Sequence, residues 1–156
     1  MKRTPTSRTE ALALIAKRQH NKEIGSEDHL QVACVNAFAN KYPEKRGRLF
    51  ATFQNPTDVT QTNIWIAKGL VAGVSDLIYI DDEFRIIGIE LKQVGKRHSA
   101  DHLRRQIQWM SNNCYRAAFV TSPEMCLDFI ECKSNGISCK FILDKLENNS
   151  IKSYVF

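Results

Sequence analysis

Residues 73–93, GVSDLIYIDDEFRIIGIELKQ, predict two apolar strands joined by a short polar turn. The first strand opens on Asp76, and the second ends with Glu90, Leu91 and Lys92. Charged side chains are costly inside a sheet unless they are paired or bind a metal ion. Because the turn falls on the sequence DDEF, Asp76 and Glu90 should lie nearly opposite each other. The hairpin therefore predicts a polar site at one end of a buried sheet.

The spacing of these charges indicates a chemistry. Side chains alternate along a strand, so Glu90 and Lys92 should share one face of the sheet and Leu91 the other. Two carboxylates from Asp76 and Glu90 suit a hard divalent cation such as Mg²⁺ or Mn²⁺. A lysine beside them can orient or deprotonate an attacking water and offset charge that develops on phosphorus. These groups could together carry out metal-assisted phosphodiester hydrolysis. The alternative, which is the commoner origin of such a charge pattern, is a cross-strand salt bridge at a sheet edge.

Outward from the hairpin, apolar periodicity and punctuating residues predict the remaining elements. A polar loop is expected at residues 55–63, a short helix or turn at 64–73, and a further loop at 93–98. The expected helices are 9–20, 27–42, 99–113 with Ser99 as cap, and one starting at Pro123; the expected strands are 49–54, 76–80, 85–92, 115–122 and 139–143. The hairpin should be antiparallel, and the following strand–helix–strand unit should be a right-handed parallel crossover. The predicted fold class is therefore α/β, with a mixed central sheet flanked by helices.

Length and composition set broad limits. The chain has 156 residues, which predicts a single domain, and 43% hydrophobic with 25% charged residues are values of an ordinary globule. No apolar run is long enough to cross a membrane and no apolar segment follows the basic start, so neither a membrane partner nor a signal peptide is expected. A cytoplasmic location follows as an expectation. The five cysteines are scattered and never form a C-x-x-C pair, which favours reduced core thiols over disulfides or a zinc finger.

The net charge of +5 is unevenly distributed along the chain. Residues 1–48 hold ten Lys/Arg and five Asp/Glu, residues 49–91 hold two and six, and residues 92–116 hold six and one. Basic segments attract phosphate backbones, and an acidic centre attracts cations. This charge distribution favours a partner with a phosphate backbone, and the alternative is a surface charged for solubility.

Several short motifs, taken in order, carry a resemblance. They are Glu27 with LQ at residues 30–31, Asn55 after a strand, KG at 68–69, AGVSDL at 72–77 and IELK at 89–92. In this combination the chain resembles the virus-type replication-repair nuclease (VRR-NUC) domain of the PD-(D/E)XK nuclease superfamily. The resemblance covers roughly residues 26–130 and implies a restriction-endonuclease-like fold. The expected organisation is a single domain spanning residues 1–156, in which about residues 1–24 form a short helical N-terminal extension. Ser75 stands where the family usually has proline, at a position that ligates nothing.

The resemblance also implies roles for individual residues. Asp76, Glu90, the main-chain carbonyl of Leu91 and Glu27 would hold Mg²⁺ or Mn²⁺, and Lys92 would act on the attacking water. The family carries a glutamine in the helix after this lysine; Gln106, Gln108 and His102 are the candidates, and Gln106 is favoured. Contacts to DNA are expected from Gln31, Asn55, Lys68, Lys96, Arg97, His102, Arg104 and Arg105.

Two histidines stand out in the basic segment after Lys92. His98 and His102 are four residues apart and could share a helix face, but a third zinc ligand is missing. A phosphate contact from either histidine fits better, since basic side chains surround both. A solvated helix face is the alternative for this whole basic group.

The sequence and the resemblance together predict a metal-dependent endodeoxyribonuclease acting on structured DNA that is branched, like a Holliday junction. The family implies a homodimer, since one active site cuts one strand, and a bacterial or phage-infected cell as the setting. No small-molecule cofactor is expected. The alternatives are a nicking or restriction-like nuclease on duplex DNA, a DNA-binding module that does not cut, and a domain that binds small molecules or proteins.

Overall fold

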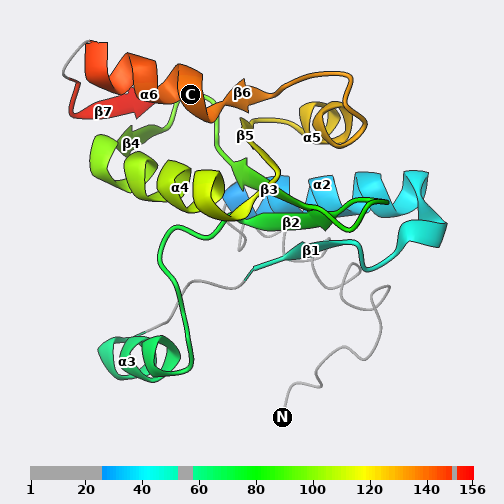
Figure 1. Cartoon of the computed structure of the whole chain (residues 1–156), viewed down its shortest axis with the longest axis horizontal. Helices are drawn as coiled ribbons and strands as arrows, with labels where there is room; N and C mark the ends of the chain where they lie inside the picture. The colour runs from blue at the N-terminus through cyan, green and yellow to red at the C-terminus, as the bar shows by residue number, and fades with distance from the viewer. Residues whose placement is uncertain (1–25, 53–57, 149–150) are drawn as a thin grey trace.

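The computed structural model describes residues 26–52, 58–148 and 151–156 (Figure 1). The helix predicted at 9–20, the extension at about 1–24 and Asn55 therefore lie outside the described residues. The helices are α2 (Ser26–Lys41), the 3-10 turn η1 (Pro43–Lys45), α3 (Val59–Ala67), α4 (Ala100–Asn113), α5 (Pro123–Ile130) and α6 (Cys139–Asn148). The strands are β1 (Leu49–Ala51), β2 (Leu77–Ile80), β3 (Ile86–Leu91), β4 (Arg97–Ser99), β5 (Arg116–Val120), β6 (Ile137–Ser138) and β7 (Ser153–Val155).

The central sheet has five strands in the order β1-β2-β3-β5-β6. As predicted, β2 and β3 form an antiparallel hairpin, and β5 lies parallel to β3 after the α4 crossover. Leu77 is paired with Ile89, so the next pair outward in this register is Asp76 with Glu90. The register thus places the two predicted carboxylates opposite each other where the ladder ends.

Helices cover both faces of this mixed sheet (Figure 1). On one face, Ile89 and Leu91 of β3 join a buried cluster with α2 and α5. On the other face, Phe119 of β5 packs with the buried sides of α4 and α6. Glu90 lies between the two inward-facing apolar residues of β3, and its side chain contacts Gln106 of α4. The predicted mixed α/β architecture with flanking helices is confirmed, and Glu90 projects from the α4 face.

The strand predicted at residues 139–143 is wrong, because this segment begins α6. The Ser138 hydroxyl accepts a hydrogen bond from the Phe141 N–H (3.1 Å) in the first turn. Ile142 and Leu146, four residues apart, are then buried together against α4 and β5. The short apolar run CKFIL fits either structure, and this helical spacing beyond it decides the outcome.

The loops predicted at 55–63 and 93–98 are each wrong in part. Asp58 caps α3 by accepting from the Gln61 N–H (2.7 Å), so the helix begins at Val59 inside the polar stretch. This helix stands away from the sheet (Figure 1). In the second loop, β4 forms a small antiparallel sheet with β7. Strands of three residues separated by more than fifty positions have too little local pattern to be read from sequence.

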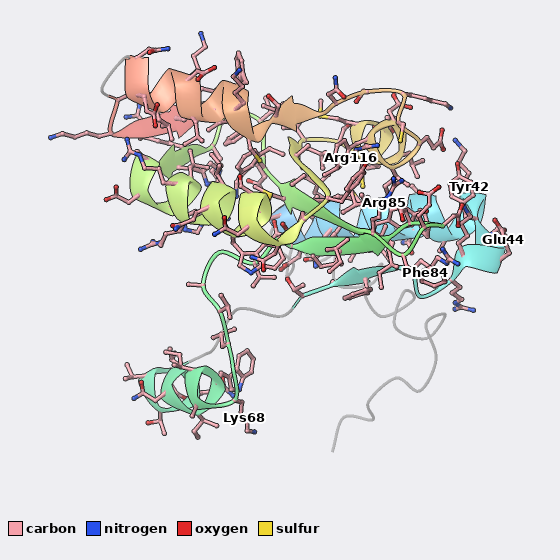
Figure 2. All side chains as sticks on the ribbon, in the orientation of Figure 1. Tyr42, Glu44, Lys68, Phe84, Arg85 and Arg116 are labelled. Atoms are coloured by element: carbon pink, nitrogen blue, oxygen red, sulfur yellow. The ribbon has the colours of Figure 1, made fainter. Side chains whose placement is uncertain are left out.

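A charged cluster around Glu131 fastens α2 to α5. The Glu131 carboxylate accepts a hydrogen bond from the Tyr42 hydroxyl (2.5 Å) and forms ion pairs with Lys133 (2.5 Å) and Lys41. Tyr42 is labelled in Figure 2 beside the end of α2. Contacts with Lys133, then Lys41 and Tyr42, lower the pKa of Glu131 to about 2.

Replacing Glu131 by glutamine should therefore lower the free energy of unfolding by about 1 kcal/mol at pH 7. Because folding lowers this pKa, the wild-type advantage is fully present above the ordinary value of 4.5 and disappears as the pH falls towards about 2. Urea unfolding of both proteins across this range measures the difference. A gap that stays constant down to pH 2 would show that the carboxylate charge is not its source.

Candidate active site

A cleft of about 620 Å³ opens where the hairpin ends, between α2 and α4. Charged and polar side chains dominate its wall. The lining residues are Glu27, Asp28, Gln31, Thr52, Gly73, Val74, Asp76, Glu90, Lys92, Gln93, Lys96, His98, His102 and Gln106. Segments far apart in sequence thus bring most of the predicted site residues to one place.

Asp76 is fixed by its backbone and by the neighbouring strand. Its carbonyl accepts from the Thr52 N–H (2.9 Å), and its Oδ2 accepts from the Leu91 N–H (2.8 Å). Gly73, three residues earlier, has a φ of +87°, and a Cβ there would stand 2.8 Å from the Arg105 carbonyl oxygen. Glycine is required for this close approach, which seats the segment before Asp76 directly on the α4 backbone.

Glu90 and Lys92 form a buried ion pair at the base of the cleft. Each is 1% exposed, and Lys92 Nζ lies 2.7 Å from Glu90 Oε1. The same oxygen accepts a hydrogen bond from the side-chain amide of Gln106, which is 5% exposed. Burying two charges is costly, so the pair is weak evidence for stability and stronger evidence for a functional role.

The carboxyl groups of Asp76 and Glu90 affect each other electrostatically in this arrangement. Burial raises the pKa of Glu90, and the nearby Asp76 raises it further against the opposing effect of Lys92. Burial likewise raises the pKa of Asp76. Glu90 Oε2 is buried without a hydrogen-bond partner. A cation between Asp76 and Glu90 would relieve the repulsion and occupy the unpartnered oxygen.

The carboxylate oxygens of Asp76 and Glu90 suit a hard divalent cation that takes few ligands from the protein. Within residues 26–52, 58–148 and 151–156, no group of three or more His, Cys, Asp or Glu side chains is arranged to hold a metal ion. Asp76 and Glu90 would therefore share the ion with water, substrate oxygens or a main-chain carbonyl. Mg²⁺ accepts such partial coordination, since it commonly retains several waters and binds through one or two carboxylates.

Glu27 and Gln31 reach the cleft from the first turns of α2. Glu27 Oε2 lies 3.3 Å from Lys96 Nζ, in an ion pair across the cleft wall. The Gln31 side-chain amide lies 3.5 Å from the Asp76 carbonyl oxygen. Both residues are thus at the site, and the carboxylate of Glu27 neutralises a lysine there.

Of the three candidates in α4 for the glutamine position, two reach the cleft. Gln106 contacts Glu90 directly, and His102 lines the cleft as an exposed side chain. Gln108 is exposed and is not part of the lining. The α4 residues that face the sheet are Leu103, Gln106, Ile107 and Met110, which explains why Gln106 points at β3.

The remaining predicted DNA contacts are spread more widely. Arg97 on β4 lies 3.5 Å from the Ser153 hydroxyl, and Arg104 pairs with Asp101 at 3.3 Å. Arg105 is exposed on α4, on the helix that forms one wall of the cleft. Lys68 follows α3, away from the sheet (Figure 2). These four residues do not line the cleft.

Thr52 and His98 are among the residues of the cleft that the sequence did not assign to the catalytic group. The Thr52 hydroxyl donates to the Ser75 carbonyl (2.5 Å) and so anchors the segment before Asp76. Nothing in the strand pattern distinguishes this threonine. His98 lines the cleft through β4, whose pairing with β7 has no local signal.

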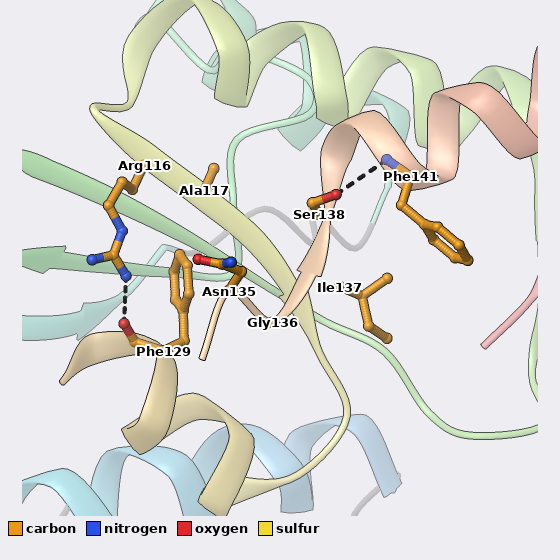
Figure 3. Close-up of a pocket in the computed structure, with 8 residues that line it drawn as sticks. All are labelled: Arg116, Ala117, Phe129, Asn135, Gly136, Ile137, Ser138 and Phe141. Atoms are coloured by element: carbon orange, nitrogen blue, oxygen red, sulfur yellow. Dashed lines mark hydrogen bonds between the residues drawn. The ribbon is translucent and has the colours of Figure 1, made fainter. Parts of the chain in front are cut away.

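A second hollow of about 670 Å³ lies between β5, β6, α5 and α6 (Figure 3). Arg116 is the one ionisable residue in its lining, and its guanidinium donates to the Phe129 carbonyl (2.5 Å). Phe129 and Phe141 contribute aromatic surface. This hollow is slightly larger than the cleft, but it lacks groups for acid–base or metal chemistry, so the cleft is the candidate active site.

In comparisons with known proteins, no family model, curated protein or solved structure matches the chain. None of the helices in the described part of the chain has the length and apolar character that a membrane crossing requires. The function of the chain is therefore inferred from the residues of the cleft and from the motifs themselves.

Proposed function

We propose that the protein is an endodeoxyribonuclease that uses Mg²⁺ or Mn²⁺, with a restriction-endonuclease-like fold of the VRR-NUC type. The observation that supports this most is the convergence of Asp76, Glu90 and Lys92 in one open cleft. A structural salt bridge needs only one carboxylate, whereas here a second is placed beside it despite the repulsion. Basic residues next to the cleft provide for a phosphate backbone.

In this proposal Asp76, Glu90 and the Leu91 carbonyl would hold the metal ion. The ion would polarise the phosphodiester and lower the pKa of the attacking water. Lys92 orients that water and offsets the charge that develops on phosphorus, from a position fixed by its contact with Glu90. Gln106 holds the Glu90 carboxylate in place through its hydrogen bond. Water adds to phosphorus as the bond to the leaving sugar oxygen breaks; the attacking water gives up one proton to solvent, and a solvent water protonates the leaving oxygen.

The proposed substrate is DNA with a branch, such as a flap or a four-way junction. The motifs that carry the VRR-NUC resemblance support this, and α3 adds a surface that stands clear of the sheet. One cleft cuts one strand, so a symmetric cut at a junction needs two copies of the chain. A homodimer is therefore part of the proposal.

Purified protein should cut DNA in Mg²⁺ or Mn²⁺ and bind it without cutting in Ca²⁺ or EDTA. The assay uses duplex, flap and four-way junction substrates with one labelled strand, and we expect the branched substrates to be cut fastest. Asp144→Asn, an exposed carboxylate on α6, serves as the control variant and should cut at the wild-type rate. Intact DNA on all three substrates in Mn²⁺ would favour a binding module over a nuclease.

A further inference from the structure

Three buried polar atoms in the cleft lack a hydrogen-bond partner. They are Glu90 Oε2, Gln106 Oε1 and His98 Nε2, and all three residues belong to the cleft lining. A buried polar atom without a partner is destabilising, so such atoms are expected to meet a ligand or an ordered water. The acceptors on Glu90 and Gln106 suit a metal ion and its water shell. His98 is not explained by the metal chemistry described above.

The position of His98 is fixed by the small sheet. His98 pairs with Tyr154 in the β4–β7 ladder, and its ring contacts the ring of Phe156 edge-to-face with 5.6 Å between centroids. The chain is also held nearby, because the Gly95 N–H donates to the Phe156 carbonyl (2.7 Å). The small sheet and the ring of Phe156 therefore hold His98, a residue of the cleft lining, in a fixed position.

The charges around His98 define what it can bind. Lys92, Lys96 and His102 surround it with positive or potentially positive groups, and Glu27 is the neighbouring carboxylate. Burial, followed by the field of Lys92, lowers the pKa of His98 to about 4. A neutral imidazole keeps one N–H donor and one acceptor. In this setting the donor suits an anionic oxygen, and a further cation is disfavoured.

We propose that His98 Nε2 donates a hydrogen bond to a non-bridging oxygen of the phosphodiester bound in the cleft. This inference rests on the proposed nuclease function and adds a substrate-binding residue to it. The phosphodiester has only acceptor oxygens, which match the donor that the imidazole supplies. Lys96 lies on the same wall and adds charge without the fixed direction of a ring nitrogen.

The test combines variants of His98 with altered DNA, measured as affinity in Ca²⁺ so that cleavage is not needed. His98→Leu removes the donor, and His98→Gln keeps an amide N–H near the position of Nε2. One methylphosphonate, which replaces a charged oxygen by methyl, is moved along the strand one phosphate at a time. For wild type, one position should weaken binding by about tenfold.

In His98→Leu, the methylphosphonate at that same position should not weaken DNA binding further, because the variant has already lost the contact. In His98→Gln, the methylphosphonate should weaken binding as it does in wild type. Additive losses at every position would overturn the inference while leaving DNA binding intact. If no DNA substrate binds to the wild-type protein, the proposed nuclease function is wrong as well. The two outcomes therefore separate a failure of the inference alone from a failure of the proposed function. Thermal unfolding of each variant checks that the small sheet remains folded.

A spectroscopic readout tests the contact in the intact site. In ¹⁵N-labelled full-length wild type with Ca²⁺, the Nε2 resonance of His98 should shift when a short branched DNA is added. Its N–H proton should also exchange more slowly with solvent. If the Lys96 amide shifts while His98 Nε2 does not, DNA occupies the cleft without the proposed hydrogen bond, and the inference is wrong.

Discussion

Replacing Lys92 by methionine should lower DNA cleavage by roughly a thousandfold and leave DNA binding in Ca²⁺ within about threefold of wild type. Methionine preserves most of the buried aliphatic stem of a side chain that is 1% exposed. What is lost is the ammonium group 2.7 Å from Glu90 Oε1. Removing a positive charge beside two carboxylates should not weaken a cation site. A loss of rate would therefore report on the lysine and not on absent metal.

Single-turnover cleavage in saturating Mn²⁺ measures the chemical step directly. Lys140→Met, at an exposed position on α6, is the matched control and should cleave at the wild-type rate. Thermal unfolding of both variants separates a catalytic defect from a folding defect. Cleavage by Lys92→Met at the wild-type rate would remove this lysine from the mechanism and would leave the buried ion pair as a structural contact.

The hairpin and its polar end were predictable because their signals are local. The position of the DDEF turn fixes the register, which places Asp76 opposite Glu90. The Ser99 cap and the apolar spacing of α4 are likewise read directly from the sequence. The β2–β3 hairpin, α4 and the parallel strand β5 therefore follow from patterns within a few residues of each other.

What could not be predicted depends on contacts between distant residues. The ion pair of Glu27 with Lys96 joins positions 69 apart, and the strand that carries His98 requires a partner near the end of the chain. Gln106 was favoured over Gln108 and His102 from the sequence, but its contact with Glu90 depends on the rotation of α4 against the sheet, which the sequence does not give. The short apolar run at 139–143 predicts a strand when taken alone, because the helical face of this segment becomes apparent only with Leu146.

Asp76→Asn is expected to abolish metal-dependent cleavage and at the same time to stabilise the metal-free protein. The Asn side-chain oxygen can still accept from the Leu91 N–H, so the backbone arrangement at 2.8 Å is preserved. The variant removes a buried negative charge that opposes Glu90. Active sites commonly sacrifice stability for such charge placement, and relief is worth about 0.5–2 kcal/mol. For a chain of this size that corresponds to a rise of roughly 2–6 °C in Tm.

Metal binding should reverse the order of stability. Because an ion that binds only the folded state stabilises it by mass action, Mn²⁺ should raise the Tm of wild type and have little effect on Asp76→Asn. Calorimetric scans with Mn²⁺ and with EDTA measure both effects, and Asp144→Asn should follow wild type in each. An equal Mn²⁺ shift in wild type and Asp76→Asn would place the ion elsewhere. A metal-free variant less stable than wild type would show that the Asp76 charge is not a source of strain but part of what holds the cleft together.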